Sequence, residues 1–430
     1  MSGIAFLKGG MILERCITAR LLRRLISAVC VFLLLSGSAA YAGPGDAASL
    51  NVSGTVGSTA ELRGVWFSYL DWNAMPADEA GFKKAADQVM DRVRANGMNA
   101  IFVHAHSHSD SYYSKTSLFP RSLFVTTKAA APAFDAFQYM IDAAHKRGIQ
   151  FHAWFNPYRV TGYLMSWDKV PEDSPAKIWY KNSAARRNVL FHDGQYYLNP
   201  SMPAVQDAVV GAVTELVQNY NVDGVQFDDY FYPALDDGNP DRSFDKAEYL
   251  ASGSALPIAA WRRNNVSELV RRVHLAIKTN RPSCTFGISP VANLTTLRKD
   301  TSMFVDIDRW MSSGDYIDYV MPQIYFGFEA KTSQGVLAEH SYEKCMNSWI
   351  ALRKKGPVKL MIGLGLYRAG TAVWDGNTIS EWLRYDDIIA RQVLSARKTG
   401  AVSGFGFYAY SSFSQEPAQK ELANLRKVLN

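Results

Sequence analysis

Short apolar segments recur along most of the chain, and longer stretches between them carry apolar residues at the spacing of three and four that is typical of amphipathic helices. Eight of the short segments are predicted to be β-strands because each is brief, apolar and followed by polar or turn-forming residues. These segments are residues 62–67, 99–105, 149–155, 222–227, 285–289, 316–323, 360–364 and 404–408.

The stretches between the predicted strands indicate helices. The clearest of them are residues 82–96, 134–147, 205–220, 261–280, 342–354 and 386–399. Several run into a glycine just before the next strand (Gly97, Gly148 and Gly400), and glycine is the preferred residue after the last turn of a helix. Strand–helix alternation along the whole chain indicates an α/β protein.

Eight strand–helix units predict a single (β/α)8 TIM barrel with extended βα loops, spanning residues 61–430. A doubly wound open sheet is the alternative that the same alternation permits. The segment before the first strand, residues 43–60, is rich in Gly, Ala, Ser and Thr and is predicted to be a flexible linker.

Residues 1–42 have the layout of a secretory signal peptide. Four arginines precede an apolar run at residues 25–35, and Ala40-Tyr41-Ala42 places small residues at the two positions that define a cleavage site. The apolar run is short for a membrane span, so a retained N-terminal anchor is the less favoured alternative. We therefore expect a secreted or periplasmic protein with no membrane span after cleavage.

Removal of this segment changes the charge of the protein. The chain of 430 residues has a formal net charge of +6, and the segment holds five basic residues and one acidic residue, which leaves +2. The basic surface that nucleic-acid binding would need is therefore largely lost, and no nucleic-acid partner is expected. Cys284 and Cys345 remain and could pair, but two thiols give no pattern from which to predict pairing.

Polar and aromatic residues gather where the predicted strands end, which is where (β/α)8 barrels hold their active sites. Side chains alternate between the two faces of a strand, and this alternation indicates which of these residues point into the barrel. The candidates for substrate binding are His104, His106, Asp110, Trp154, Asn156, Arg159, Tyr230, Gln323 and Tyr325. We assign no metal site and no cofactor.

Asp228 is the first candidate for catalysis, because alternation turns it inward at the mouth of the barrel. Carboxylates among aromatic residues suggest glycoside hydrolysis, in which one acid protonates the leaving oxygen and another acts as nucleophile or base. The second carboxylate is open between Asp229, Glu329 and Asp110, all at predicted strand ends. The structural alternatives are that Asp228 caps the turn after its strand or pairs with Arg159, and that Glu329 is a solvated loop charge.

Seven motifs occur in order along the chain and together resemble the glycosyl-hydrolase-like 10 family (DUF187). They are Leu62-Arg63-Gly64-Val65-Trp66, Trp154-Phe155-Asn156-Pro157-Tyr158-Arg159, Tyr197-Leu198-Asn199-Pro200, Asp223-Gly224-Val225-Gln226-Phe227-Asp228-Asp229-Tyr230-Phe231-Tyr232-Pro233, Trp261-Arg262-Arg263-Asn264-Asn265-Val266, Gly287-Ile288-Ser289-Pro290 and Pro322-Gln323-Ile324-Tyr325.

The resemblance covers about residues 61–410 and implies a TIM-barrel hydrolase of the cell envelope. It further implies action on peptidoglycan glycan strands that lack stem peptides, with a link to cell division. Asp228, Asp229 and Tyr230 are its implied active-site positions, and Asn156, Arg159, Gln323 and Tyr325 its implied substrate contacts. One departure from the pattern is His106, which stands where the family has arginine.

Two other classes of function remain open. His-x-His at the end of the second predicted strand is a metal-ligand arrangement in some barrels, so a metal-dependent hydrolase or deacetylase is one alternative. The other is a non-catalytic glycan-binding barrel that keeps aromatic platforms for sugar rings. The expected binding partner in each case is a glycan, most simply peptidoglycan, and the sequence leaves protein partners open.

Overall fold

The computed structural model describes residues 61–126, 134–235, 244–301, 303–331, 334, 338–354, 356–372 and 381–430. The predicted signal peptide (1–42) and linker (43–60) lie outside these residues. Within the described residues, no helix is long and apolar enough to cross a membrane. Cys284 and Cys345 are buried free thiols.

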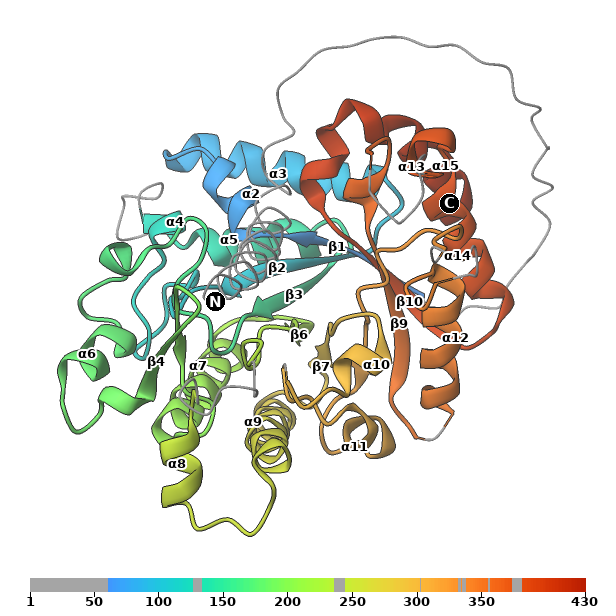
Figure 1. Ribbon diagram of the computed structural model, residues 1–430. Helices are drawn as coiled ribbons and strands as arrows, with labels where there is room; N and C mark the ends of the chain where they lie inside the picture. The colour runs from blue at the N-terminus through green and yellow to red at the C-terminus, as the bar shows by residue number, and fades with distance from the viewer. Residues whose placement is uncertain are drawn as a thin grey trace, which may run out of the picture. The chain divides into compact units, whose positions relative to one another are not determined.

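Eight parallel strands close into a barrel, as the sequence predicts (Figure 1). The barrel strands are β1 (Leu62–Phe67), β2 (Ala100–His106), β3 (Gln150–Phe155), β6 (Gly224–Phe227), β7 (Thr285–Ile288), β8 (Tyr319–Val320), β9 (Lys359–Leu364) and β10 (Val402–Phe407). Because β1 pairs with both β2 and β10, the sheet has no free edge, and the open doubly wound sheet is wrong.

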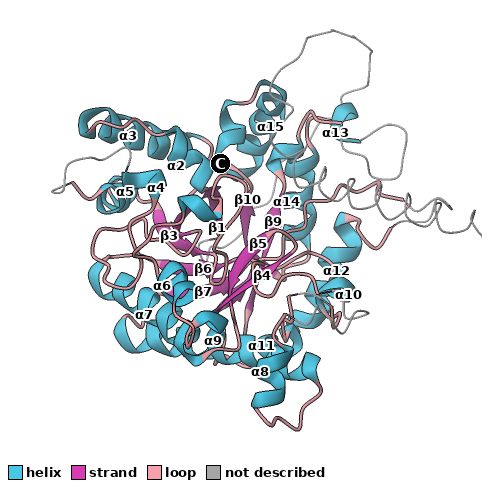
Figure 2. Cartoon of the chain, turned by 60° about the vertical axis from the view of Figure 1, so that its left-hand side comes forward, coloured by secondary structure: helices cyan, strands magenta, loops and turns pink. Residues whose placement is uncertain are grey.

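Helices surround the strands (Figure 2). They are α2 (Tyr69–Ala74), α3 (Glu79–Ala95), α4 (Leu123–Thr126), α5 (Ala136–His145), α6 (Pro175–Lys181), α7 (Pro203–Asn219), α8 (Lys246–Ala251), α9 (Ile258–Asn280), α10 (Leu294–Leu297), α11 (Ile307–Ser312), α12 (Tyr342–Arg353), α13 (Glu381–Arg384), α14 (Ile388–Lys398) and α15 (Gln419–Leu429). Short 3-10 helices are η1 (Trp167–Lys169), η2 (Arg186–Asn188), η4 (Leu366–Arg368), η5 (Tyr410–Ser414) and η6 (Glu416–Ala418).

The six helices that the sequence predicts are confirmed as α3, α5, α7, α9, α12 and α14, with ends that shift by a few residues. Gly97, Gly148 and Gly400 have φ of 78°, 68° and 65° and end three of them, as predicted. A side chain at these left-handed positions would be strained, which explains why glycine stands there.

The interior of the barrel is filled by large side chains that form the floor beneath its mouth. The members of this inner cluster are Trp66, Phe102, Trp154, Tyr319, Met321 and Met361. Gln226 is buried in the same layer, where it accepts a hydrogen bond from the Trp66 indole at 2.7 Å. A Cβ atom at Gly287 would lie 2.1 Å from the Tyr319 ring, so glycine is what lets this ring fit against β7.

An antiparallel hairpin, which the sequence analysis missed, interrupts the βα alternation between β3 and β6. It consists of β4 (Val189–His192) and β5 (Gln195–Leu198), joined at Asp193 and Gly194, which both have positive φ. Asp-Gly is a strong hairpin signal, but these strands are only four residues long each. The hairpin returns to the barrel mouth through an isolated bridge between Tyr197 and Arg159.

Candidate active site

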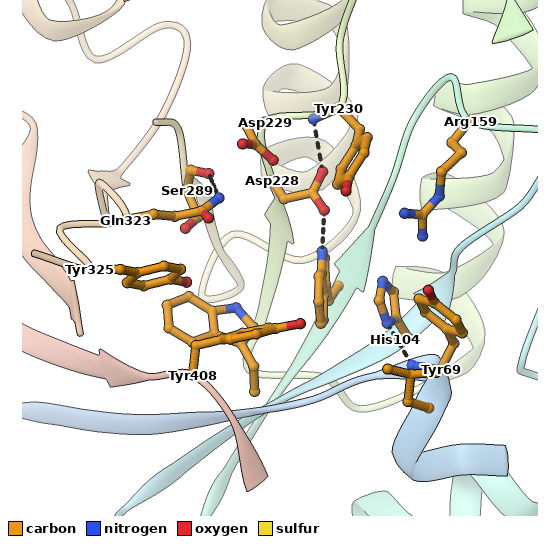
Figure 3. A pocket seen from close by; sticks show the side chains of 13 residues that line it. Tyr69, His104, Arg159, Asp228, Asp229, Tyr230, Ser289, Gln323, Tyr325 and Tyr408 are labelled. Atoms are coloured by element: carbon orange, nitrogen blue, oxygen red, sulfur yellow. Dashed lines mark hydrogen bonds between the residues drawn. The ribbon is translucent and has the colours of Figure 1, made fainter. Parts of the chain in front are cut away.

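A cavity of about 220 Å³ opens at the C-terminal ends of the barrel strands, above the inner cluster (Figure 3). Its lining consists of carboxylates, amides and aromatic rings drawn from strands around the barrel. These residues are Trp66, Tyr69, Leu70, His104, Trp154, Arg159, Asp228, Asp229, Tyr230, Ser289, Gln323, Tyr325 and Tyr408.

Asp228 is held by donors on both of its carboxylate oxygens. Its Oδ2 accepts hydrogen bonds from the Trp154 indole at 3.0 Å and from the Asn156 amide, and its Oδ1 accepts one from the backbone N–H of Tyr230 at 3.1 Å. The side chain is 4% exposed, so this small opening is toward the cavity that it lines. Three N–H donors favour the ionised form and fix the direction of the carboxylate.

Asp229 lines the same cavity, although strand alternation would turn it away from Asp228. The reason is that β6 ends at Phe227, so alternation no longer governs the chain at Asp229. Burial raises the pKa of Asp228 to about 7, to which repulsion from Asp229 adds, and raises that of Asp229 to about 6 despite a hydrogen bond from Gln323. The charge of Arg159 opposes both shifts. Such a pair titrates in two coupled steps, and it holds one proton over a range of pH that reaches toward neutrality.

A chain of hydrogen bonds runs from the first barrel loop to Asp228. The backbone N–H of Tyr69 donates to Nδ1 of His104 at 2.9 Å, so this nitrogen carries no proton. The proton is therefore on Nε2, which lies 3.0 Å from Oδ1 of Asn156 and donates to it. Burial and the charge of Arg159 lower the pKa of His104 well below its usual range, which keeps the ring neutral.

Arg159 is buried between the rings of Tyr230 and Tyr69, with its guanidinium carbon 4.6 and 5.4 Å from the two ring centroids. It donates from Nε to the backbone oxygen of Ser107 at 2.8 Å and from a terminal nitrogen to Oδ1 of Asn156. The guanidinium thus orients Asn156 and brings a positive charge to the rim of the cavity.

Aromatic rings form the wall opposite these groups. Tyr325 stacks on Tyr408 at 5.8 Å between centroids, while Gln323 donates to the backbone oxygen of Ser289 at 2.9 Å. One face of Trp154 is covered by His104, whose ring is 3.4 Å away, centroid to centroid. Rings and amides in one cavity suit a sugar, which presents apolar faces and a belt of hydroxyls.

Most of the candidates from the sequence are brought together here. His104, Trp154, Arg159, Asp228, Asp229, Tyr230, Gln323 and Tyr325 line the cavity. Asn156 is absent from the lining because it lies fully buried behind Asp228. His104 also departs from its expected role, since both ring nitrogens are already used within the protein.

Three other candidates lie away from the cavity, each for a local reason. His106 is turned away by a register shift between His104 and His106, and its ring packs on Phe155 and Phe119. Asp110 accepts backbone N–H groups of Ser107 and His108 at 2.9 Å each and closes its own loop.

Glu329 is the third, and it is not among the residues that line the cavity. It forms an ion pair with Arg384, and its side chain is 38% exposed. The alternative of a solvated loop charge is therefore the one that the structure supports. Of the three carboxylates that the sequence offered as partners for Asp228, only Asp229 lines the cavity.

The histidines of β2 do not converge on a metal site. Among the described residues, no three or more His, Cys, Asp or Glu side chains are grouped in a way that could hold a metal ion. The register shift after His104 explains this, because it sends His104 and His106 to different sides of the strand.

Sequence reasoning missed Tyr69 and Leu70, which line the cavity from the start of α2. Their signal was available, since they directly follow the first predicted strand, at the end where the other candidates were found. Ser68 caps α2 in a capping box with Asp71, and this turn brings Tyr69 over the barrel mouth.

Comparison with known proteins agrees with this geometry. The model of a family described as glycosyl hydrolase-like 10 matches residues 61–380. The glycosyl hydrolase YngK of Bacillus subtilis is 30% identical over 385 residues, which cover 84% of this chain and 70% of that protein. The glycosyl hydrolase DigH of Escherichia coli K12 is 31% identical over 343 residues, which cover 73% of this chain and 75% of that protein.

Solved structures support the fold alone. The glycoside hydrolase domain of PgaB (BpsB) from Bordetella bronchiseptica superposes with a TM-score of 0.57 at 16% identity, covering 86% of this chain and 99% of that domain. The catalytic domain of a beta-amylase from Paenibacillus polymyxa gives a TM-score of 0.56 at 10% identity, with 85% and 97% covered.

Proposed function

The chain belongs to the glycosyl hydrolase-like 10 family, and from this premise we propose that it hydrolyses glycosidic bonds of a cell-envelope polysaccharide. The observation that carries the proposal is the pair Asp228–Asp229 inside an aromatic-walled cavity at the barrel mouth. Two carboxyl groups whose pKa values are raised by burial can give and take a proton near neutral pH, which acid/base cleavage of a glycoside requires.

We assign different roles to the two carboxyl groups. Burial raises the pKa of Asp228 as well, but its three N–H donors stabilise a negative charge and fix its direction, so we assign it as the oriented carboxylate beside the reacting carbon. Asp229 is hydrogen-bonded by the Gln323 side chain and its own backbone N–H, and it is more exposed than Asp228, which suits a group that gives its proton to the leaving oxygen and takes it back. Tyr325 and Trp154 contact the sugar, and Gln323 hydrogen-bonds its polar substituents.

For the substrate, we propose peptidoglycan glycan strands that lack stem peptides. This choice rests on the predicted export of the protein and on the motifs shared with the family. The cavity supports it, since its volume suits one sugar unit and its mouth is rimmed by Arg159, from the loop after β3, and Tyr230, from the loop after β6.

The test is mass spectrometry of amidase-stripped glycan strands after incubation with the protein. We expect shorter oligosaccharides that carry one added water with the wild type, and at least a roughly 100-fold slower release with Asp228→Asn or Asp229→Asn. Glu329→Gln is the matched control, because this carboxylate pairs with Arg384 away from the cavity and its loss is expected to leave the rate unchanged. Strands that stay intact with every protein would contradict the proposed activity and favour a glycan-binding barrel.

We further propose that the protein acts in the periplasm or outside the cell after removal of residues 1–42. Fractionation of cells that produce the full chain, followed by N-terminal sequencing, tests this. The expected mature protein begins at Gly43. Recovery of the uncleaved chain in the membrane fraction would instead support a retained anchor.

A further inference from the structure

The two cavity carboxylates belong to consecutive residues at the end of one strand. Their Cα atoms are therefore about 3.8 Å apart, and both side chains approach a bound sugar from the β6 side of the barrel. Glycosidases that use two enzyme carboxylates place them on opposite sides of the scissile bond, about 5–5.5 Å or about 6.5–9.5 Å apart. The pair Asp228–Asp229 does not have this arrangement.

The wall that faces this pair offers no carboxylate among the residues that the structure describes. It is formed by Tyr325 and Tyr408, and Tyr69 closes a third side. Gln323 lies beside Asp229, to which its side chain is hydrogen-bonded. Burial raises the pKa of Tyr325 well above its usual range, so its phenol is not ionised near neutral pH and is a poor nucleophile. What is missing from the described site is a group that attacks the sugar carbon from across the ring.

We propose that the substrate supplies this group itself: the carbonyl oxygen of a 2-acetamido substituent on the sugar that occupies the cavity attacks its own C1. This inference rests on the proposed function and narrows it. The sugar on the non-reducing side of the cleaved bond must then be a 2-acetamido-2-deoxy sugar, joined by a β-linkage so that the acetamido oxygen lies opposite the leaving group.

The reaction balances with two carboxyl groups on one side. In the first step, Asp229 gives its proton to the glycosidic oxygen as the bond from that oxygen to C1 breaks. At the same time the acetamido oxygen forms a bond to C1. Asp228 accepts the hydrogen bond of the acetamido N–H. In the second step, water opens the oxazolinium. The water oxygen bonds to C1 as the bond from C1 to the acetamido oxygen breaks, and the water proton goes to Asp229. One water is consumed, and the configuration at C1 is retained.

The contacts of Asp228 suit it to orient the acetamido group better than to attack C1 itself. Its oxygens already accept three N–H donors, which stabilise a negative charge but reduce its power as a nucleophile. The carboxylate is also fixed in direction, which is what orientation of an acetamido N–H requires. Asp228 and Trp154 lie together on one side of the cavity, where the indole gives the acetamido methyl an apolar surface.

The experiment compares the same amidase-stripped strands before and after chemical removal of their N-acetyl groups. The thiazoline analogue of N-acetylglucosamine, a stable mimic of the cyclic intermediate, is added in a parallel series and its binding measured by calorimetry. Early proton NMR spectra of the products report the configuration at the new reducing end. Asp228→Asn is measured with Glu329→Gln as its control.

We expect cleavage of the acetylated strands alone, a β-configured first product, and competitive inhibition by the thiazoline. Asp228→Asn is expected to weaken thiazoline binding at least about tenfold, since it loses a charged acceptor, and Glu329→Gln to leave it unchanged. Cleavage of both kinds of strand, an inverted product, or a covalent glycosyl-enzyme would overturn this inference and leave the proposed hydrolase standing. If no strand is cleaved, both proposals fail.

Discussion

The amide of Asn156 has one orientation that satisfies its neighbours. Its oxygen accepts from His104 and Arg159, so its nitrogen must face Asp228, to which it donates. His104 in turn is fixed by the backbone N–H of Tyr69. His104 is therefore a positioning residue, which acts on the carboxylate through Asn156 and does not need to touch the substrate.

His104→Phe tests this role, because phenylalanine keeps a ring against Trp154 but removes both hydrogen bonds. The freed Asn156 amide donates less firmly to Asp228, so the ionised form is less stabilised and the pKa of Asp228 rises. We expect kcat on stripped glycan strands to fall about tenfold with little change in KM, and the acid limb of the pH–rate profile to move to higher pH. A uniform loss at all pH values would indicate general damage to the fold.

The same residues show what a sequence can predict of a site. Asp228 was identifiable because alternation holds to the end of β6 at Phe227. Asp229 was a candidate too, but alternation could not predict its direction, which depends on how the chain turns after the strand. His106 was misplaced for a similar reason: a shift of register in β2 is set by pairing with β3, which lies about fifty residues further along the chain.

At the scale of elements, the loop after β6 is tied to α9 by a buried ion pair. Arg262 and Asp245 are 1% and 0% exposed and lie 2.8 Å apart, and Tyr232 donates to the second oxygen of Asp245 at 2.8 Å. Tyr232 follows Asp228 by four residues. The motif around Arg262 was visible in the sequence, but its partner was not, because Asp245 lies in a long loop without a periodic pattern.

Arg262→Met is expected to lower the free energy of unfolding by about 3–5 kcal/mol, since it leaves the Asp245 carboxylate buried without its cation. Adding Asp245→Asn removes that charge yet keeps an acceptor for Tyr232, so the double variant should recover at least half of the loss. Urea unfolding of the wild type, both single variants and the double variant measures this coupling. Additive losses would show that the two side chains do not act as a pair.

A second buried carboxylate joins two helices at the other end of the chain. Glu421 in α15 accepts the backbone N–H groups of Ile388, Ile389 and Ala390 at the start of α14, at 2.9, 2.8 and 3.2 Å. Burial raises the pKa of Glu421 from about 4.5 to about 7 despite these donors. The folded protein thus binds this proton more tightly than the unfolded chain does.

The sign of the pH effect follows from this difference. The stability that Glu421 contributes is fully present below about pH 4.5 and is lost as the pH rises to about 7. Glu421→Gln cannot titrate, so relative to this variant the wild type should lose roughly 1–3 kcal/mol between pH 5 and pH 8. Urea unfolding of both proteins at the two pH values measures it, and an equal change in both would contradict the assignment.

At the scale of the whole molecule, eight predicted strand–helix units favour a closed barrel, and the pairing of β1 with both β2 and β10 confirms it over the open sheet that the same alternation permits. The hairpin β4–β5 had to be missed, because each strand is too short for its alternation to stand out and its position depends on contacts with the barrel mouth. What the sequence predicts well is thus the repeated unit, and what it predicts poorly are the loops that make one barrel differ from another.

Closure also determines where the chain can be shortened. β1 pairs with β2 on one side and β10 on the other, and Glu61 just before it forms an ion pair with Arg397 at 2.7 Å. A chain that begins at Glu61 keeps all of these contacts, so its free energy of unfolding should lie within about 1 kcal/mol of the chain that begins at Gly43, with the same rate on glycan strands.

A chain that begins at Ser68 lacks β1, exposes the edges of β2 and β10, and removes Trp66 from the floor of the cavity. We expect it to be recovered unfolded or aggregated, as judged by circular dichroism and size-exclusion chromatography. If the chain from Glu61 were much less stable than the chain from Gly43, residues 43–60 would contribute to folding and would not be a simple linker.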